Sequence, residues 1–373
     1  MSDRGCLTDS TRWVVKIGTS SLTNFESGLN HEEIRSWVSQ IATLKQEGID
    51  IVLVSSGSIG EGMRRLGWSI RPSQVHKLQA AAAVGQMGLI QSYESVFQEF
   101  DILTAQVLLT HADLANRERY LNARSTLREL LQLGVVPIVN ENDTVVNDEI
   151  RFGDNDTLAA LVTNLVEAKT LVLLTDQQGL FDKDPRIDLT ASLIQYGEAN
   201  DDSLLSKAGS AGGMGSGGMQ TKVLAARKAS KSGAATVIAY GGEDRILLRL
   251  RAGELLGTVL YPGSERLVAR KQWLAGQLRS NGKLCLDEGA VTVLTKQGKS
   301  LLPIGVFDVK GSFSRGEIVT CIDLNGNEIA YGLVNYGAGE ASKIKGRSSK
   351  EIESILGYGG ESELIHRDNI AFK

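Results

Sequence analysis

Short apolar runs alternate with stretches of helical periodicity through the first two-thirds of the chain. The apolar runs predict strands at residues 13–17, 51–54, 102–109, 135–139, 171–174 and 236–239. Continuous apolar strands separated by helices are typical of a parallel sheet that is covered by helices on both faces. The pattern therefore predicts a three-layer α/β/α sandwich with a mainly parallel sheet over residues 1–262.

The stretches between the runs predict the helices of that sandwich. In the first of them, apolar residues recur at helical spacing between positions 34 and 44. Asn30 is placed to cap this helix with Glu33 three residues on, and Gly48 suits the position after its last turn. Further helices are predicted at about 73–97, around 127–131, at about 157–168 and at about 221–232.

The alternation stops near residue 262. Residues 263–277, with a charged run from Arg266 to Lys271, are predicted to be a linker. Beyond them come short apolar runs with frequent glycine at 291–294, 304–309, 316–320 and 328–333. Residues 278–373 are therefore predicted to form a small, mostly β domain.

Composition excludes several classes of protein. The 373 residues suggest two domains, and 42% hydrophobic residues are too many for a disordered chain. No stretch approaches the roughly 20 apolar residues of a membrane span, and the N-terminus has no apolar signal segment. Cys6, Cys285 and Cys321 lie far apart, which argues against a disulfide scaffold or a zinc site. We expect a soluble cytoplasmic protein, and the net charge of −4 indicates no nucleic acid partner.

Unusual polar residues follow the predicted strands. In an open α/β sheet, ligands bind beyond the carboxyl ends of the strands. Such residues occur in the segments 16–21, 55–60, 140–143 and 175–176, and in two loops that precede helices, 153–156 and 212–222. The chain has 41 glycines and only 5 prolines, a balance that favours tight turns around a ligand over a disordered linker.

Two of these segments could hold the phosphates of a nucleotide. Glycine before a helix lets backbone N–H groups approach an anion, and Lys16 and Lys222 stand beside such turns. Neither segment matches the P-loop or the dinucleotide-binding pattern. Plain tight turns and a solvated Lys16 remain alternatives, as do helix capping by Asp154 or Asp156 and an Asx turn at Asp143. Against a solvated Lys16, the residue interrupts an apolar run where an unpaired ammonium would be costly.

Histidine is missing from these segments. The chain has four histidines, at 31, 76, 111 and 366, which argues against imidazole acid–base catalysis and a Ser-His-Asp triad. Phosphoryl transfer to a carboxylate needs no base, because that acceptor is already ionised at pH 7. Such an enzyme needs positive charge on the phosphates and a positioned nucleophile.

Taken together, the strand-end motifs resemble the amino-acid kinase family, and within it the glutamate 5-kinases. The motifs are VVKIGTSSL, VSSGSIGEG, NENDTV, FGDNDTLAA, LLTDQQGLFDKDPR and GSGGMQTKVLAA, in order from about Val14 to Ala239. DEGA, SLLPIGV and FSRGE in the C-terminal part resemble the PUA domain of the bacterial members. The resemblance implies phosphorylation of the side-chain carboxylate of L-glutamate by ATP with Mg²⁺, the first step of proline biosynthesis.

The resemblance also implies roles for individual residues. Lys16 and Lys222 would neutralise charge on the transferring phosphoryl group, and Asp156 would hold both lysines in place. Binding of ATP would involve Lys16, Thr175, Asp176, Ser216, Gly217, Gly218, Met219, Gln220, Thr221 and Lys222. Binding of glutamate would involve Ser56, Gly57, Asn140, Asp143 and Asn155. We interpret Asp143 as facing the free α-ammonium group of the substrate, and assign no residue as a direct metal ligand. Ser216 departs from the threonine common in the family but keeps the hydroxyl.

The resemblance implies partners as well. It implies inhibition by proline, a homo-oligomer (dimer or tetramer) and a glutamyl-phosphate reductase that takes the product. PUA domains often bind RNA, but residues 278–373 carry 12 basic and 12 acidic residues, and a phosphate-tracking surface is usually basic. A local basic patch keeps an RNA-binding role open: Lys343, Lys345, Arg347 and Lys350. A kinase for a related acid, such as N-acetylglutamate, and a nucleotide- or RNA-binding regulator that has lost turnover are also compatible with the sequence.

Overall fold

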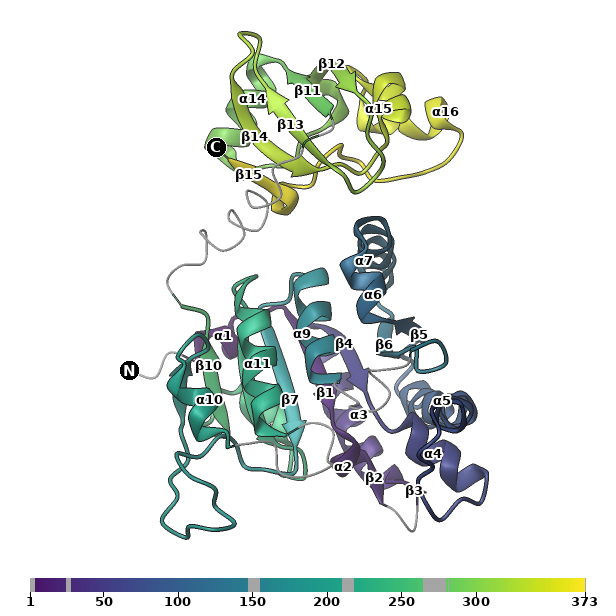
Figure 1. Ribbon diagram of the computed structural model, residues 1–373, viewed down its shortest axis with the longest axis vertical. Helices are drawn as coiled ribbons and strands as arrows, with labels where there is room; N and C mark the ends of the chain where they lie inside the picture. Colours follow the sequence, from purple (N-terminus) through teal and green to yellow (C-terminus); the bar gives the residue numbers. More distant parts are fainter. Residues whose placement is uncertain are drawn as a thin grey trace. The chain divides into compact units, whose positions relative to one another are not determined.

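The computed structural model describes residues 4–24, 28–146, 155–209, 218–263, 280 and 282–372. The chain divides into two compact units, one made of residues 1–114 and 126–266 and the other of residues 115–125 and 267–373 (Figure 1). Most of the predicted linker at 263–277 lies outside the described residues, so the domain boundaries stay a prediction.

The first unit is built around a mainly parallel sheet. Its eight described strands have the order β5-β6-β4-β1-β7-β9-β10-β8. Of the pairs between them only β9–β10 is antiparallel, and since β8 is parallel to β10, these two strands run opposite to the other six. In that order the strands are β5 (Thr104–Leu109), β6 (Val136–Glu141), β4 (Asp50–Ser55), β1 (Arg12–Ile17), β7 (Thr170–Thr175), β9 (Ala235–Tyr240), β10 (Thr258–Tyr261) and β8 (Tyr196–Glu198). The predicted fold class is confirmed, and the strands β8 and β10 are additions to the predicted set.

Helices cover both faces of this sheet. On one face, α3 (His31–Gln46) packs against α5 (Val75–Gln98) and α12 (Ile246–Arg251), and on the other α9 (Asn155–Leu165) packs against α11 (Met219–Ser230). The remaining described elements of this part are α1 (Gly5–Thr8), α2 (Thr19–Leu22), β2 (Thr23–Asn24), β3 (Gly28–Leu29), α4 (Ser58–Arg65), α6 (His111–Ala115) and α10 (Ser203–Lys207). Helix α7 (Arg117–Gln132) is divided between the units, with its residues up to 125 in the second. As predicted, the Asn30 side chain caps α3 by accepting from the Glu33 N–H at 3.2 Å, and Gly48 follows the helix at φ +82°.

Strand β1 shows how the sheet divides its two faces. Successive side chains of a strand point to opposite faces. Trp13, Val15 and Ile17 belong to the core cluster that also contains the buried apolar residues of α3 and α5. Lys16 therefore points to the other face, where α9 and α11 lie, and it is 5% exposed there.

The second unit carries a five-stranded sheet among its described residues. Its strands are β12 (Val306–Gly311), β11 (Gly282–Leu286), β13 (Ile318–Ile322), β14 (Glu328–Leu333) and β15 (Ile370–Phe372), in that spatial order. Around them lie α14 (Glu288–Gln297), α15 (Ala338–Ile344), α16 (Ile352–Leu356) and the 3₁₀ turns η1 (Pro303–Gly305), η2 (Ser349–Glu351) and η3 (Arg367–Asn369). Lys345 belongs to the basic patch that the sequence predicts. Its Nζ pairs with Asp308 Oδ1 at 2.7 Å, so part of the positive charge of the patch is neutralised locally.

One predicted element of this unit is wrong. Residues 291–294 lie inside α14 and do not form a strand. The Asp287 side chain accepts a hydrogen bond from the Ala290 N–H at 2.7 Å and caps the helix, and Gly298 at φ +59° follows its last turn. A short apolar run cannot be told from a buried helical segment by periodicity alone, and the flanking cap decides. The strands β11 and β15 were not predicted.

Candidate active site

A cavity of about 700 Å³ opens where β1 and β7 end. Lys16 comes from the end of β1, Thr175 is the last residue of β7, and Ser56 follows β4 directly. Gly218, Met219, Gln220 and Lys222 reach the same cavity from the start of α11. The structure thus brings into one cavity residues that are separated by about two hundred positions, at the sheet edge where the sequence pattern predicts a ligand.

The centre of the site is a buried carboxylate between two lysines. Asp156 Oδ1 lies 2.6 Å from Lys16 Nζ, and Asp156 Oδ2 lies 3.1 Å from Lys222 Nζ. The three side chains are only 1–7% exposed. The buried Lys16 is therefore ion-paired, and the alternatives of a solvated lysine and a purely helix-capping Asp156 are wrong.

This arrangement carries net positive charge at the cavity. Burial acts to raise the pKa of Asp156, but the charges of Lys16 and Lys222 outweigh it and lower that pKa to about 2. Burial lowers the pKa of Lys222, and Asp156 opposes that shift. One carboxylate against two ammonium groups suits a polyanion such as a nucleotide triphosphate.

Secondary structure explains why these three side chains meet. Lys16 faces the helices α9 and α11 because of its register on β1, Asp156 lies in the first turn of α9, and Lys222 lies in the first turn of α11. Thr221 Oγ1 lies 2.8 Å from Asp156 Oδ2 and 2.7 Å from the Gly218 carbonyl oxygen, which ties the start of α11 to α9. The N-terminus of this 12-residue helix thereby faces the cavity with the positive end of its dipole.

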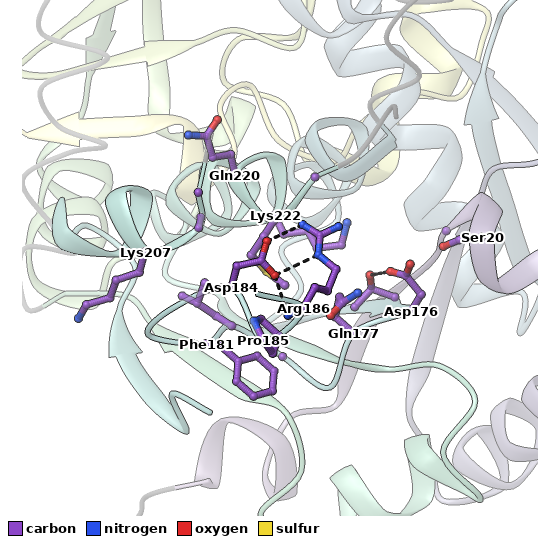
Figure 2. Close-up of a pocket in the computed structure, with 18 of the residues that line it drawn as sticks. Ser20, Asp176, Gln177, Phe181, Asp184, Pro185, Arg186, Lys207, Gln220 and Lys222 are labelled. Atoms are coloured by element: carbon purple, nitrogen blue, oxygen red, sulfur yellow. Dashed lines mark hydrogen bonds and ion pairs between the residues drawn. The ribbon is translucent and has the colours of Figure 1, made fainter. Parts of the chain in front are cut away.

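One wall of the cavity consists of residues to which the sequence pattern gave no role. The segment 177–186, which follows Asp176, supplies Gln177, Phe181, Asp184, Pro185 and Arg186 (Figure 2). Within it the Asp184 carboxylate accepts two hydrogen bonds from the Arg186 guanidinium, at 3.0 and 2.8 Å. The motif LLTDQQGLFDKDPR already contained these residues. Spacing along the chain, however, does not tell which of them face a ligand.

A second cluster lies beside Ser56. The Asn155 side-chain amide nitrogen lies 2.9 Å from each of three acceptors: the Ser55 carbonyl oxygen, Ser56 Oγ and Asn140 Oδ1. The Asn140 amide in turn donates to Gln86 Oε1 at 2.7 Å. Since Asn155 precedes Asp156 on α9, this polar cluster and the lysine pair share one helix start.

Asp143 is tied to the same strand end through α4. Ser58, the first residue of α4, donates a hydrogen bond from Oγ to Asp143 Oδ2 at 3.0 Å. Gly57 precedes it in the left-handed region, at φ +99°, where a side chain would be strained. Burial raises the pKa of Asp143 to about 6, and the Ser58 hydrogen bond and Arg71 oppose that shift. The carboxylate is mostly ionised at pH 7 and responds to modest acidification.

Helices α4 and α5 touch backbone to backbone under this cluster. A Cβ on Gly85 of α5 would lie 1.8 Å from the Ser58 carbonyl oxygen, and one on Gly62 would lie 1.7 Å from the Ala81 carbonyl oxygen. The glycines therefore determine where the start of α4, with Ser58, sits.

Some of the predicted site residues lie outside the described residues. They are Ser216 and Gly217 of the expected ATP segment and residues 153 and 154 of the other loop.

Comparison with known proteins agrees with the two-part organisation. The amino acid kinase family matches residues 11–240, and the PUA domain matches residues 282–356. Among curated proteins, the glutamate 5-kinase of Hahella chejuensis is 60% identical over 98% of this chain and 95% of its own length. Those of Thioalkalivibrio sulfidiphilus and Paraburkholderia phytofirmans are 60% and 59% identical, over 96% and 98% of this chain and 96% and 99% of their own. The crystal structure of a UMP kinase from Bacillus anthracis covers 68% of this chain and 97% of its own at 15% identity, with a TM-score of 0.49.

Proposed function

The chain belongs to the amino acid kinase family and, within it, to the glutamate 5-kinases, and on that premise we propose how its residues perform the reaction. The reaction transfers the γ-phosphoryl group of ATP to the side-chain carboxylate of L-glutamate and yields L-glutamyl 5-phosphate and ADP, the first step of proline biosynthesis. The observation that carries the assignment of roles is the buried Asp156, which places two ammonium groups at the cavity.

Lys16 and Lys222 neutralise charge on the phosphoryl group as it moves. Catalysis of phosphoryl transfer is mainly positioning and electrostatic stabilisation, so preorganised cations are what this chemistry needs. Asp156 holds both ammonium groups in place and prevents their mutual repulsion from separating them. Thr175, Asp176 and the start of α11 up to Lys222 bind the nucleotide, with Ser216 and Gly217 assigned to it by the family motif. The nucleotide lies in the cavity that Thr175, Asp176, Lys222 and the residues 218–220 line.

Glutamate binds at the polar cluster next to the lysines. Ser56, Gly57, Asn140, Asp143 and Asn155 surround it in this proposal. The acceptor oxygen needs no general base, because the side-chain carboxylate of glutamate is ionised at neutral pH. The Asp143 carboxylate binds the α-ammonium group, which an N-acetylated substrate lacks.

The reaction would use Mg²⁺ supplied together with ATP. Mg²⁺ prefers oxygen ligands and is usually held by one or two carboxylates together with substrate phosphates. In the described part of the chain no group of three or more His, Cys, Asp or Glu side chains could hold a metal ion by itself, whereas Asp176 lines the cavity with a carboxylate. Asp176 is therefore the residue we assign to the metal side of the nucleotide. When bound, the ion lowers the charge repulsion between the phosphates and the incoming carboxylate.

Three further properties follow from family membership as proposals. The protein is inhibited by proline, which would compete at the glutamate cluster. It forms a homo-oligomer, either a dimer or a tetramer. Its product, a reactive acyl phosphate, passes to a glutamyl-phosphate reductase in the cytoplasm. Among the described residues no helix is long and apolar enough to cross a membrane.

Trapping of the acyl phosphate tests the proposal directly. Hydroxylamine converts an acyl phosphate to a hydroxamate, so we would offer glutamate, N-acetylglutamate and aspartate in parallel with ATP and Mg²⁺. We expect hydroxamate from glutamate alone, and its loss in Lys222→Ala. Lys231→Ala, at the exposed far end of α11, is the matched control and should keep full activity. Product from N-acetylglutamate or aspartate alone would overturn the assignment of glutamate as the substrate. No product from any of the three acids would overturn the kinase assignment.

A further inference from the structure

Beneath the proposed glutamate cluster lies a chain of three buried amides. Gln86 on α5, Asn140 on β6 and Asn155 on α9 are 8%, 1% and 6% exposed. Asn140 connects the other two: its Nδ2 donates to Gln86 Oε1 at 2.7 Å, and its Oδ1 lies 2.9 Å from Asn155 Nδ2. Gln86 is not among the residues assigned to the site above.

Two backbone groups identify which atom of each amide is the oxygen and which is the nitrogen. Asn140 Oδ1 accepts a hydrogen bond from the Glu141 backbone N–H at 2.8 Å, so this atom must be the oxygen. Asn155 Nδ2 lies 2.9 Å from the Ser55 carbonyl oxygen, so that atom must be the nitrogen. Given both constraints, Asn140 presents its NH₂ group to Gln86, and only the oxygen of Gln86 can meet it.

These hydrogen bonds determine which group Asn155 can offer to a substrate. Both amide hydrogens of Asn155 face the acceptors of Ser55, Ser56 and Asn140, so within the described part of the chain its Oδ1 is the group left for a ligand. The only hydrogen-bond donor of ionised glutamate is its α-ammonium group. An Asn155 turned by 180° would instead present a donor, which suits a carboxylate or an acyl oxygen.

We propose that Gln86 is a positioning residue that holds Asn140, and through it Asn155, in the orientation that offers Asn155 Oδ1 to the α-ammonium group of glutamate. The inference rests on the proposed function and extends its choice of substrate. Only the oxygen of the Gln86 amide takes part in this arrangement. Its nitrogen, Nε2, is buried and has no hydrogen-bond partner in the described structure. A glutamine kept for packing stability would satisfy both sides.

This asymmetry predicts an unusual effect for Gln86→Met. The substitution leaves Asn140 Nδ2 without its acceptor but also removes the unpaired Nε2 donor, so the melting temperature should change little. The KM for glutamate should rise about fivefold to tenfold, as for the loss of one well-placed hydrogen bond, with kcat and the KM for ATP within about twofold of wild type. Gln86→Glu keeps an oxygen for Asn140 and should restore the KM for glutamate to within about threefold of wild type.

Gln40→Met is the matched control. Gln40 on α3 is also buried, at 3% exposure, and it uses both sides of its amide: Oε1 accepts from the Leu247 N–H at 2.8 Å and Nε2 donates to the Ser36 carbonyl at 3.2 Å. Its replacement should lower the melting temperature and leave the KM for glutamate unchanged. The two methionine variants are therefore expected to show opposite signatures.

Steady-state kinetics of wild type and these variants, with thermal unfolding in parallel, separate the outcomes. An unchanged KM for glutamate in Gln86→Met, or an equal rise in Gln40→Met, would overturn the positioning role. If Gln86→Met does not fold, Asn140→Asp tests the same contact, because it removes the amide donor that Gln86 Oε1 accepts from. An unchanged KM for glutamate in that variant would overturn the positioning role equally. Wild type that phosphorylates no glutamate would instead overturn the proposed function and this inference with it.

Discussion

Removal of the charge on Asp156 should disable phosphoryl transfer without weakening nucleotide binding. In Asp156→Asn the side chain keeps its size, but Lys16 and Lys222 lose the carboxylate that lies 2.6 and 3.1 Å from their Nζ atoms. The two ammonium groups then repel each other in a site where all three side chains are nearly inaccessible to water. They will move apart or lose a proton.

The magnitude follows from burial. Removal of one partner from a buried ion pair costs about 3–5 kcal/mol of folding stability, because a charge is left uncompensated. Loss of one preorganised electrostatic group costs about 10²–10³ in kcat, and this substitution displaces two such groups. We therefore expect kcat to fall by at least about 10²-fold. The KM for ATP should stay the same or fall, since the free site is at least as positive as in wild type.

A pH profile distinguishes this mechanism from general damage. Burial already lowers the pKa of Lys222, and Asp156 opposes that shift. Without Asp156 the pKa of Lys222 falls further, so Lys222 loses its proton at lower pH. The alkaline limb of kcat in Asp156→Asn should accordingly move to lower pH than in wild type, as measured by hydroxamate formation across the pH range.

Thr221→Val provides a graded control. It removes the hydroxyl that lies 2.8 Å from Asp156 Oδ2 and leaves all three charges in place. We expect a loss in kcat of about tenfold, which is the lower end of the effect of one hydrogen bond to a charged group, about 1.5 kcal/mol. A kcat for Asp156→Asn within threefold of wild type, with an unmoved alkaline limb, would refute the role given to the carboxylate.

Two further predictions concern the glutamate cluster. The pKa of Asp143 is raised to about 6 by burial, so only about one-tenth of it is ionised at pH 5, and the KM for glutamate should rise up to about tenfold between pH 7 and pH 5. Asp143→Asn should have a high KM with no such pH dependence; a dependence that persists in this variant would contradict the assignment. Gly85→Ala places a Cβ 1.8 Å from the Ser58 carbonyl oxygen, and should cost about 1–3 kcal/mol in urea unfolding and raise the KM for glutamate. Gly88→Ala is the control, because the atoms nearest to its Cβ would belong to the movable guanidinium of Arg65, and an equal loss in both variants would refute the argument from backbone contact.

Local pattern was sufficient for most of the first unit. Continuous apolar runs predicted the central strands, and the cap at Asn30 marked where α3 begins, because both signals depend only on neighbouring residues. The same reasoning failed at residues 291–294, where the short apolar run is equally compatible with a strand and a helix. There the cap at Asp287 favours the helix, and the strand prediction did not take that cap into account.

For the site, the sequence determined which residue types stand at the strand ends and the family they indicate. A lysine within an apolar strand already required a buried partner, but not which of the nearby carboxylates would provide it. Only the tertiary structure selects Asp156, because the register of β1 turns Lys16 toward the two helices that carry Asp156 and Lys222. The same holds for Gln86, an inconspicuous residue of a long helix that acquires a role only where α5 meets Asn140. Distances between side chains on different elements depend on packing, and no spacing along the chain contains them.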